Sequence, residues 1–203
     1  MEARDETLED AQIVRQVLRG KRERFGILLE RYQRPIFNFI YRFYGNYDLA
    51  QELTQETFLR AYQFLKSYDT KRKFSTWLYA VAKNLCIDEL KKQKSGREIP
   101  LDDAMVAVEA KMADSAGGAD QQGQCIRREE DFRLIEALQE LPSAARTVLL
   151  LHYFQGLAYQ EIGEALDLPV STVKIRIFRA KKALLAKWKE MAGEEEMRLP
   201  GNG

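Results

Sequence analysis

The chain has 203 residues, 45% of them hydrophobic, which is enough to fill one large core or two small ones. Its 32 basic and 31 acidic residues give a formal charge of +1, so a uniformly basic, nucleic-acid-binding surface is excluded and any such function must come from local clusters. Without a membrane-length apolar run, a signal-peptide core, a CxxC motif or a second histidine, we expect a cytoplasmic protein with no direct membrane insertion, no metal and no cofactor.

Four helices are predicted in the first part of the chain. Apolar residues recur at helical spacing over residues 8–18 and again over 25–43, where Pro35 lacks a backbone donor and should bend the helix. A third helix fits residues 48–66, with Tyr62 on its inner face, and a fourth fits 75–92 after a polar loop at 68–73. Four helices with short connections are typical of a compact helical domain, which we assign to residues 1–94.

The composition then changes over residues 95–127. Between positions 98 and 120 there are six acidic residues and one lysine, a net charge of −5. Such a segment is typical of a flexible linker. Helical periodicity resumes at Arg128, so we assign a second helical domain to residues 128–192 and a disordered tail to 193–203. The predicted fold is therefore all-α, with two small helical domains joined by a flexible linker.

Residues 159–184 read YQEIGEALDLPVSTVKIRIFRAKKAL, two short amphipathic segments that break at residues 167–169. Pro169 disfavours helix at the residue before it, which places a turn there. Residues 170–189 hold seven basic residues and no acidic one. Charge concentrated next to such a turn favours the recognition helix of a helix-turn-helix over a merely solvated face. The inner face of this helix should consist of Val173, Ile177, Ala180 and Leu184.

The opposite face of the same helix is the predicted DNA surface. Lys174 and Arg179 could reach base edges or phosphates, while Ile175 and Phe178 could meet thymine methyl groups. Hydroxyl side chains in the first turn could cap the helix or touch a phosphate. The residues predicted to contact DNA here are Ser171, Thr172, Lys174, Ile175, Arg176, Phe178, Arg179 and Lys182.

Two features of the first domain also point to partners. Asp48, Glu52 and Glu56 recur every four residues beside Gln51 and Gln55, a spacing that by itself favours a solvated helix face. The stretch DTKRKFSTWLYAVAKNLCIDELKK, residues 69–92, puts a basic loop before an aromatic helix. Aromatic and basic residues together suit single-stranded DNA, although core packing explains the aromatic residues equally well.

Taken in order, DLAQELTQETFLRAY, KFSTWLYAVAKNLCID, the acidic linker and YQEIGEALDLPVSTVKIRIFRAKKAL resemble the bacterial extracytoplasmic-function (ECF) sigma factors. These are the compact group of the housekeeping-type superfamily and hold only regions 2 and 4. The resemblance covers residues 10–190. It implies a transcription initiation factor, not an enzyme, that binds core RNA polymerase and recognises the −35 and −10 promoter elements.

The resemblance also assigns roles to the motifs. The residues expected on the coiled coil of the polymerase β′ subunit are Asp48, Gln51, Glu52, Gln55 and Glu56. Those expected to recognise and open the −10 element are Lys71, Arg72, Lys73, Phe74, Ser75, Thr76, Trp77, Lys83 and Asn84. The second domain is expected to read the −35 element and to dock on the β-flap. Ala80 and Val81 replace the tryptophan pair of housekeeping sigma factors, which implies weaker intrinsic melting.

For this chain we expect a monomer that acts in an envelope or other stress response. Members of this family are usually held inactive by an anti-sigma factor, which is often anchored in the membrane. The acidic linker is expected to pass through the polymerase near its RNA exit path. The main alternative is an ordinary helix-turn-helix regulator with a sensor domain, which would bind a palindrome as a dimer without polymerase. An enzyme is disfavoured because no P-loop, metal cluster or nucleophile elbow is present in the sequence.

Overall fold

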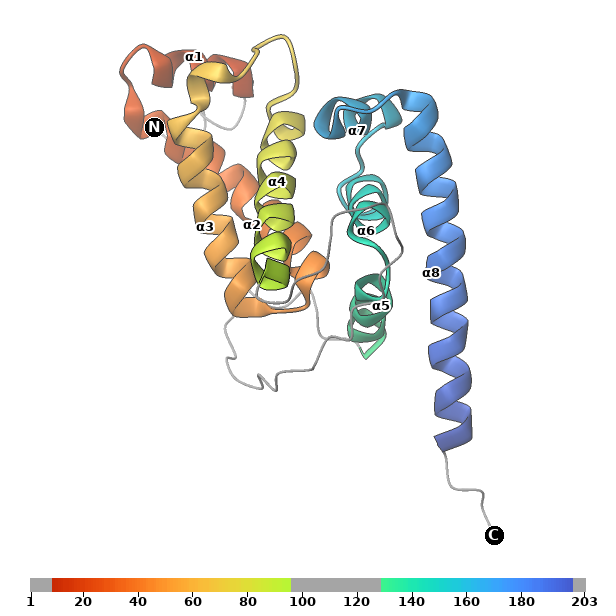
Figure 1. Ribbon diagram of the computed structural model, residues 1–203. Coiled ribbons are helices and arrows are strands. Elements are labelled where there is room, and N and C mark those ends of the chain that lie inside the picture. The colour runs from red at the N-terminus through yellow and green to blue at the C-terminus, as the bar shows by residue number, and fades with distance from the viewer. Residues whose placement is uncertain (1–8, 96–128, 199–203) are drawn as a thin grey trace.

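The computed structural model describes residues 9–95 and 129–198, and in those ranges it contains helices, turns and loops but no strand (Figure 1). Our predictions for the acidic linker and for residues 199–203 fall outside the described residues. The all-α fold with two helical domains is confirmed.

The first domain contains the four predicted helices. Helix α2 continues through Pro35 and ends at Tyr44. Gly45 follows it with a φ of 70°, a left-handed conformation that favours glycine. Asn46 then caps α3, because its side chain accepts a hydrogen bond from the Leu49 N–H at 2.9 Å. The elements are α1 (Asp10–Leu18), η1 (Arg22–Arg24), α2 (Phe25–Tyr44), α3 (Tyr47–Gln63), η2 (Leu65–Ser67) and α4 (Phe74–Ser95).

Our placement of Tyr62 on the inner face of α3 is wrong. Its side chain is 38% exposed, and one edge-to-face contact with Phe25 covers only part of the ring. Helical spacing placed Tyr62 on the apolar side of α3, and its ring does contact Phe25, but the residue lies in the last turn of the helix, which ends at Gln63.

The second domain begins with α5 (Glu129–Gln139) and α6 (Ser143–Leu149). Helix α6 runs into a π-helical turn, η4 (Leu150–Phe154), which the Gln155 N–H closes on the Leu150 carbonyl at 3.1 Å. Helices α7 (Tyr159–Leu166) and α8 (Val170–Arg198) complete the domain. Helix α8 therefore continues past residue 192, where we placed the end of this domain.

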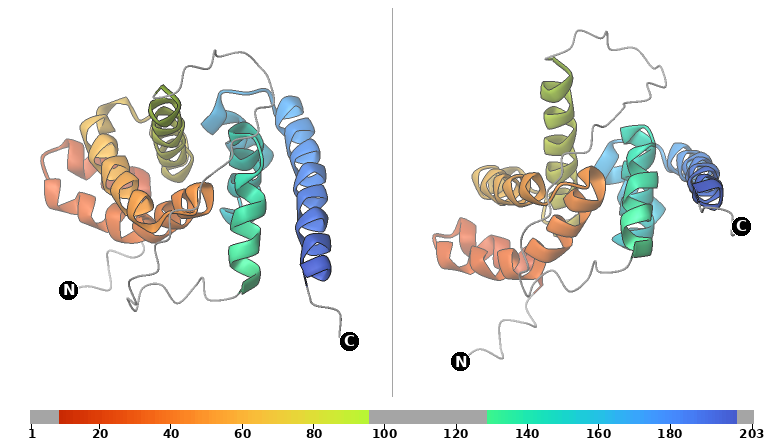
Figure 2. Two further views of the ribbon diagram at one scale, coloured as in Figure 1. Left: turned by 60° about the horizontal axis from the view of Figure 1, so that its bottom comes forward. Right: turned by 90° about the horizontal axis from the view of Figure 1, so that it is seen from below.

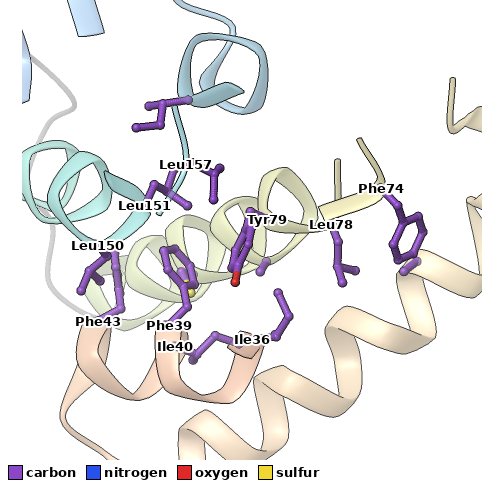
Figure 3. Packing of buried hydrophobic residues seen from close by; sticks show 14 of the residues in the cluster. Ile36, Phe39, Ile40, Phe43, Phe74, Leu78, Tyr79, Leu150, Leu151 and Leu157 are labelled. Atoms are coloured by element: carbon purple, nitrogen blue, oxygen red, sulfur yellow. The ribbon is translucent and has the colours of Figure 1, made fainter. Parts of the chain in front are cut away.

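The two domains share one hydrophobic core, which the sequence did not predict. Leu150, Leu151 and Leu157 of the second domain lie beside aromatic residues of α2 and α4 in the first (Figure 3). Figure 2 shows α8 on the side of the second domain that faces away from the first. Helices α5, α6 and α7 thus lie between α8 and the first domain.

Candidate nucleic-acid interface

The turn between α7 and α8 has the geometry of a helix-turn-helix. Asp167 adopts a left-handed conformation (φ 54°), and the Leu168 N–H donates to the Gly163 carbonyl at 2.9 Å. A Cβ at Gly163 would lie 2.8 Å from the Leu168 carbonyl oxygen, so the tight turn requires glycine. After Pro169, α8 starts at Val170. The predicted break at residues 167–169 is confirmed.

The start of α8 distinguishes between the two roles predicted for Ser171 and Thr172, a helix cap and a phosphate contact. Because the helix starts at Val170, Ser171 and Thr172 lie in its first turn and neither precedes the helix as its N-cap. Of the two roles considered from the sequence, a phosphate contact is the one that suits this position.

Helix α8 divides into a buried and an exposed face as predicted. Val173, Ile177 and Ala180 are buried, and Leu184 packs against the core while partly exposed. Ile175 is 52% exposed and Phe178 is 71% exposed, although burial of such side chains is favourable. We call the exposed side the recognition face, and it consists of Lys174, Ile175, Phe178, Arg179 and Lys182.

The predicted acidic stripe lies on the outer side of α3. Asp48, Gln51, Glu52 and Gln55 are exposed. Glu56 is half-buried and forms an ion pair with Arg60, with 2.7 Å between its Oε1 and the arginine Nε. Four exposed side chains therefore remain available to a protein partner, while the fifth also supports the helix through an internal i,i+4 pair.

The basic loop before α4 is held by its own side chains. The Tyr68 hydroxyl donates to the Arg72 carbonyl at 2.5 Å, and the Lys71 N–H donates to Asp69 Oδ1 at 3.0 Å. These bonds fix the backbone, while the side chains of Lys71, Arg72 and Lys73 stay exposed. The loop presents three positive charges at the start of α4.

The predicted −10 residues on α4 divide into buried and accessible side chains. Phe74 is 1% exposed and Thr76 is 2% exposed, so both are core residues in this conformation and neither side chain reaches the surface. Trp77 is half-buried, with its ring 5.5 Å from that of Tyr68 and 5.6 Å from that of Phe74. The polar side chains Ser75, Lys83 and Asn84 are partly or fully exposed.

Acidic residues of the second domain act on two lysines of this predicted DNA surface, one by direct contact and one through its charge alone. The Nζ of Lys73 lies 2.6 Å from Oε1 of Glu161 in α7, and this hydrogen bond raises the pKa of the lysine. Burial lowers the pKa of Lys83, and the charges of Asp88 and Asp167 act in the opposite direction. Asp167 belongs to the helix-turn-helix turn.

Glu161 has two partners. Its Oε2 accepts a hydrogen bond from the Ala158 N–H at 2.7 Å and so caps α7, while Oε1 meets Lys73. Burial alone would raise the pKa of Glu161, but these two hydrogen bonds lower it overall. The sequence did not single out this residue, and no local pattern could have done so, because its interdomain partner is distant in the chain.

Arg146 is a second interdomain residue that the sequence analysis did not identify. It is 8% exposed and donates hydrogen bonds to the Gln139, Leu141 and Phe43 carbonyls, the last of which belongs to α2. Burial lowers its pKa to about 10. A lone arginine two residues before the apolar run at 148–151 was the available signal.

Two further properties concern the described ranges, 9–95 and 129–198. No helix there is both long and apolar enough to cross a membrane. No group of three or more histidine, cysteine or acidic side chains there could hold a metal ion.

Comparisons with known proteins match both domains. Family models of sigma-70 region 2 and sigma-70 region 4 match residues 28–96 and 131–184. The chain is 37% identical over 174 residues to the ECF RNA polymerase sigma factor SigW of Bacillus subtilis, covering 84% of this chain and 92% of that one.

Solved structures share the same arrangement of helices. CnrH, in complex with the cytosolic domain of CnrY, aligns with a TM-score of 0.65 at 22% identity, covering 87% of this chain and 95% of that one. The sigma factor RpoE of Bartonella quintana, in complex with the anti-sigma factor NepR, aligns with a TM-score of 0.60 at 19% identity, covering 81% and 96%. These two likenesses concern the fold.

Proposed function

Because the chain belongs to the ECF RNA polymerase sigma factors, we propose that it binds core polymerase and directs initiation at promoters with specific −35 and −10 elements. The polymerase supplies the catalysis, and the chain acts as a non-enzymatic specificity subunit. The recognition face of α8 is the observation that carries this proposal. It combines exposed cations with two large exposed apolar side chains directly after a helix-turn-helix turn.

The −35 element is the target of α8. A recognition helix enters the major groove with the residues near its N-terminus at the base edges. Lys174 and Arg179 then reach bases or phosphates, and Ile175 and Phe178 contact thymine methyl groups. Arg176 and Lys182 bind phosphates, which position the helix without specifying sequence. Ser171 and Thr172 touch a phosphate at the start of the helix.

The −10 element is the target of the basic loop and of the accessible residues of α4. Lys71, Arg72 and Lys73 supply countercharge for the backbone, and Trp77 offers part of a ring for contact with a base. Ser75, Lys83 and Asn84 extend the polar surface along the helix. Phe74 and Thr76 support this surface from the core and are not proposed as DNA contacts.

The exposed residues of the acidic stripe bind the β′ coiled coil, and the second domain also docks on the β-flap. One monomeric helix-turn-helix offers limited contact area on DNA. Attachment of both domains to polymerase makes the second DNA contact intramolecular, so that two weak modules read one promoter. This explains how a nearly neutral chain achieves specific recognition.

Regulation by an anti-sigma factor is part of the same proposal. The Bartonella quintana neighbour was solved in complex with an anti-sigma factor. For this chain we expect a monomer in the cytoplasm, held inactive by an anti-sigma factor that is anchored in the membrane and released in a stress response. Pull-down from membrane and soluble fractions would locate that partner.

Run-off transcription with purified core polymerase on genomic fragments tests the proposed function. We expect transcripts from a small set of promoters that share −35 and −10 sequences, and only when the chain is added. Tight binding of the isolated chain to a palindrome, without transcripts, would instead support the alternative of an ordinary helix-turn-helix regulator.

A further inference from the structure

The surface of α4 that is proposed to bind the −10 strand packs against α7 of the helix-turn-helix. Lys73, at the N-terminal end of α4, forms an ion pair with Glu161. Further along α4, Lys83 is close enough to Asp167 for the aspartate charge to act on its pKa. At Lys73, a cation proposed to meet a DNA phosphate thus meets a carboxylate of the same chain.

Further contacts hold α7 and the preceding turn in this position. The Tyr79 hydroxyl in α4 donates to Oε1 of Gln155, and the two residues are 76 positions apart. The guanidinium of Arg42 lies over the Phe154 ring, 4.7 Å from its centroid. Buried Leu157 packs beside Tyr79 (Figure 3). Apolar and hydrogen-bonded contacts therefore support the charged pairs, which at an exposed surface contribute little by themselves.

This arrangement affects the two DNA-reading surfaces differently. The recognition face of α8 is exposed. By contrast, a DNA strand on α4 must replace Glu161 at Lys73 and would approach the negative charges of Glu161 and Asp167. The recognition face of α8, proposed to bind the −35 element, is thus open. Part of the α4 surface proposed to bind the −10 strand is covered.

We propose that the free chain holds itself closed, with α7 held against α4 and Glu161 standing in for a DNA phosphate against Lys73. Helix α7 must leave α4 before the −10 strand binds. This inference rests on the proposed function for the role of α4, but the closed contact is a property of the free chain and can be measured without polymerase.

Two variants of the full-length chain test the closed contact. The first combines Glu161→Gln and Asp167→Asn, which removes both charges. Glutamine can still accept the Ala158 N–H at the start of α7, and asparagine tolerates the left-handed conformation of Asp167. The second, Gln155→Ala, removes the acceptor of the Tyr79 hydroxyl without changing the net charge.

The matched control combines Glu164→Gln and Glu136→Gln. It removes the same number of negative charges from exposed positions in α7 and α5. The probe is a fluorescein-labelled DNA single strand of random sequence, followed by fluorescence anisotropy. Small-angle X-ray scattering gives the radius of gyration of each protein in the absence of DNA.

If the contact closes the chain, both test variants bind the single strand roughly threefold or more tightly than wild type, because a larger fraction is binding-competent. Their radius of gyration also increases, while the control stays close to wild type in both measurements. An equal gain in the control would show general charge repulsion and overturn the proposal. Unchanged affinity and radius in both test variants would also overturn it.

Run-off transcription separates this inference from the proposed function. If wild type directs transcription but the test variants gain neither radius of gyration nor affinity for the single strand, the proposal of a closed contact is wrong and the proposed function stands. If the variants open and gain affinity but no form directs transcription, the closed contact stands and the proposed function fails.

Discussion

The guanidinium of Arg146 in α6 lies over the ring of Phe43 in α2, with its central carbon 4.9 Å from the ring centroid. Its Nη1 also donates to the Phe43 carbonyl, 103 residues away in the sequence. Because the same side chain binds the Gln139 and Leu141 carbonyls, it joins the C-terminal ends of α2 and α5. A cation is favourable at such helix ends. Arg146 therefore links the two domains.

Substitution Arg146→Met should lower the free energy of unfolding by about 2–4 kcal/mol, because it leaves several carbonyl groups without their buried donor. Urea denaturation followed by circular dichroism measures this loss. Arg19→Met removes the same side chain from an exposed position and should cost less than about 0.5 kcal/mol. Equal losses in the two variants would contradict an interdomain role for Arg146.

Gly45 should resist substitution because the second domain approaches it closely. A Cβ there would lie 1.9 Å from Nε2 of Gln139 and 3.2 Å from Cγ2 of Ile135. Gly156 has a similar φ, 67° against 70°, but nothing within 4 Å of its added Cβ. In both alanine variants the left-handed backbone should cost about 1 kcal/mol of stability. Gly45→Ala should lose more than this, because its new Cβ also meets Gln139 and Ile135.

A double variant isolates the steric part of this difference. Gln139→Ala should recover part of the extra loss in Gly45→Ala, because it removes the atoms nearest the new Cβ. Thermal unfolding of the single and double variants measures the coupling. Purely additive effects would show that the strain at Gly45 is local to its backbone.

Lys174→Ala and Arg179→Ala should each weaken −35-dependent transcription. Loss of a base contact costs about 1–3 kcal/mol of binding free energy. Loss of a phosphate contact instead reduces the slope of log K against log salt concentration by about one. Run-off assays at several salt concentrations distinguish the two roles. Lys189→Ala, further along α8 and also exposed, is the matched control. Normal transcription by both test variants would show that the recognition face is misassigned.

Charge reversal in the acidic stripe should abolish co-purification with core polymerase. Glu52 is exposed, so Glu52→Lys should leave the fold intact, as circular dichroism can verify. Glu23→Lys makes the same charge change at another exposed position of the first domain and should leave binding unchanged. If Glu52→Lys still binds core polymerase, the acidic stripe is only a solvated helix face.

Cys86 should not react with thiol reagents in the folded protein. Its side chain is buried, and burial raises the pKa of the thiol, so little thiolate forms near neutral pH. Alkylation followed by peptide mapping reports on this residue separately. Modification should appear only at denaturant concentrations that unfold the first domain, and rapid labelling under native conditions would contradict the burial of Cys86.

The sequence alone was enough to predict the helices and the exposed side of α8. Helical periodicity is a local property, so the alternation of Val173 and Ile177 with cations already determined which side of α8 is buried. The turn at residues 167–169 was equally readable, because Pro169 directly disfavours helix at the residue before it.

Only the tertiary structure decided which residues of the −10 stretch lie at the surface and which part of the surface the other domain covers. Phe74 is aromatic next to a basic loop, and that pattern suits DNA contact and core packing equally. The pairing of Lys73 with Glu161, and of Arg146 with the Phe43 carbonyl, joins residues far apart in the chain. Periodicity shows which face of a helix is apolar, but the partner of that face depends on how the two domains pack.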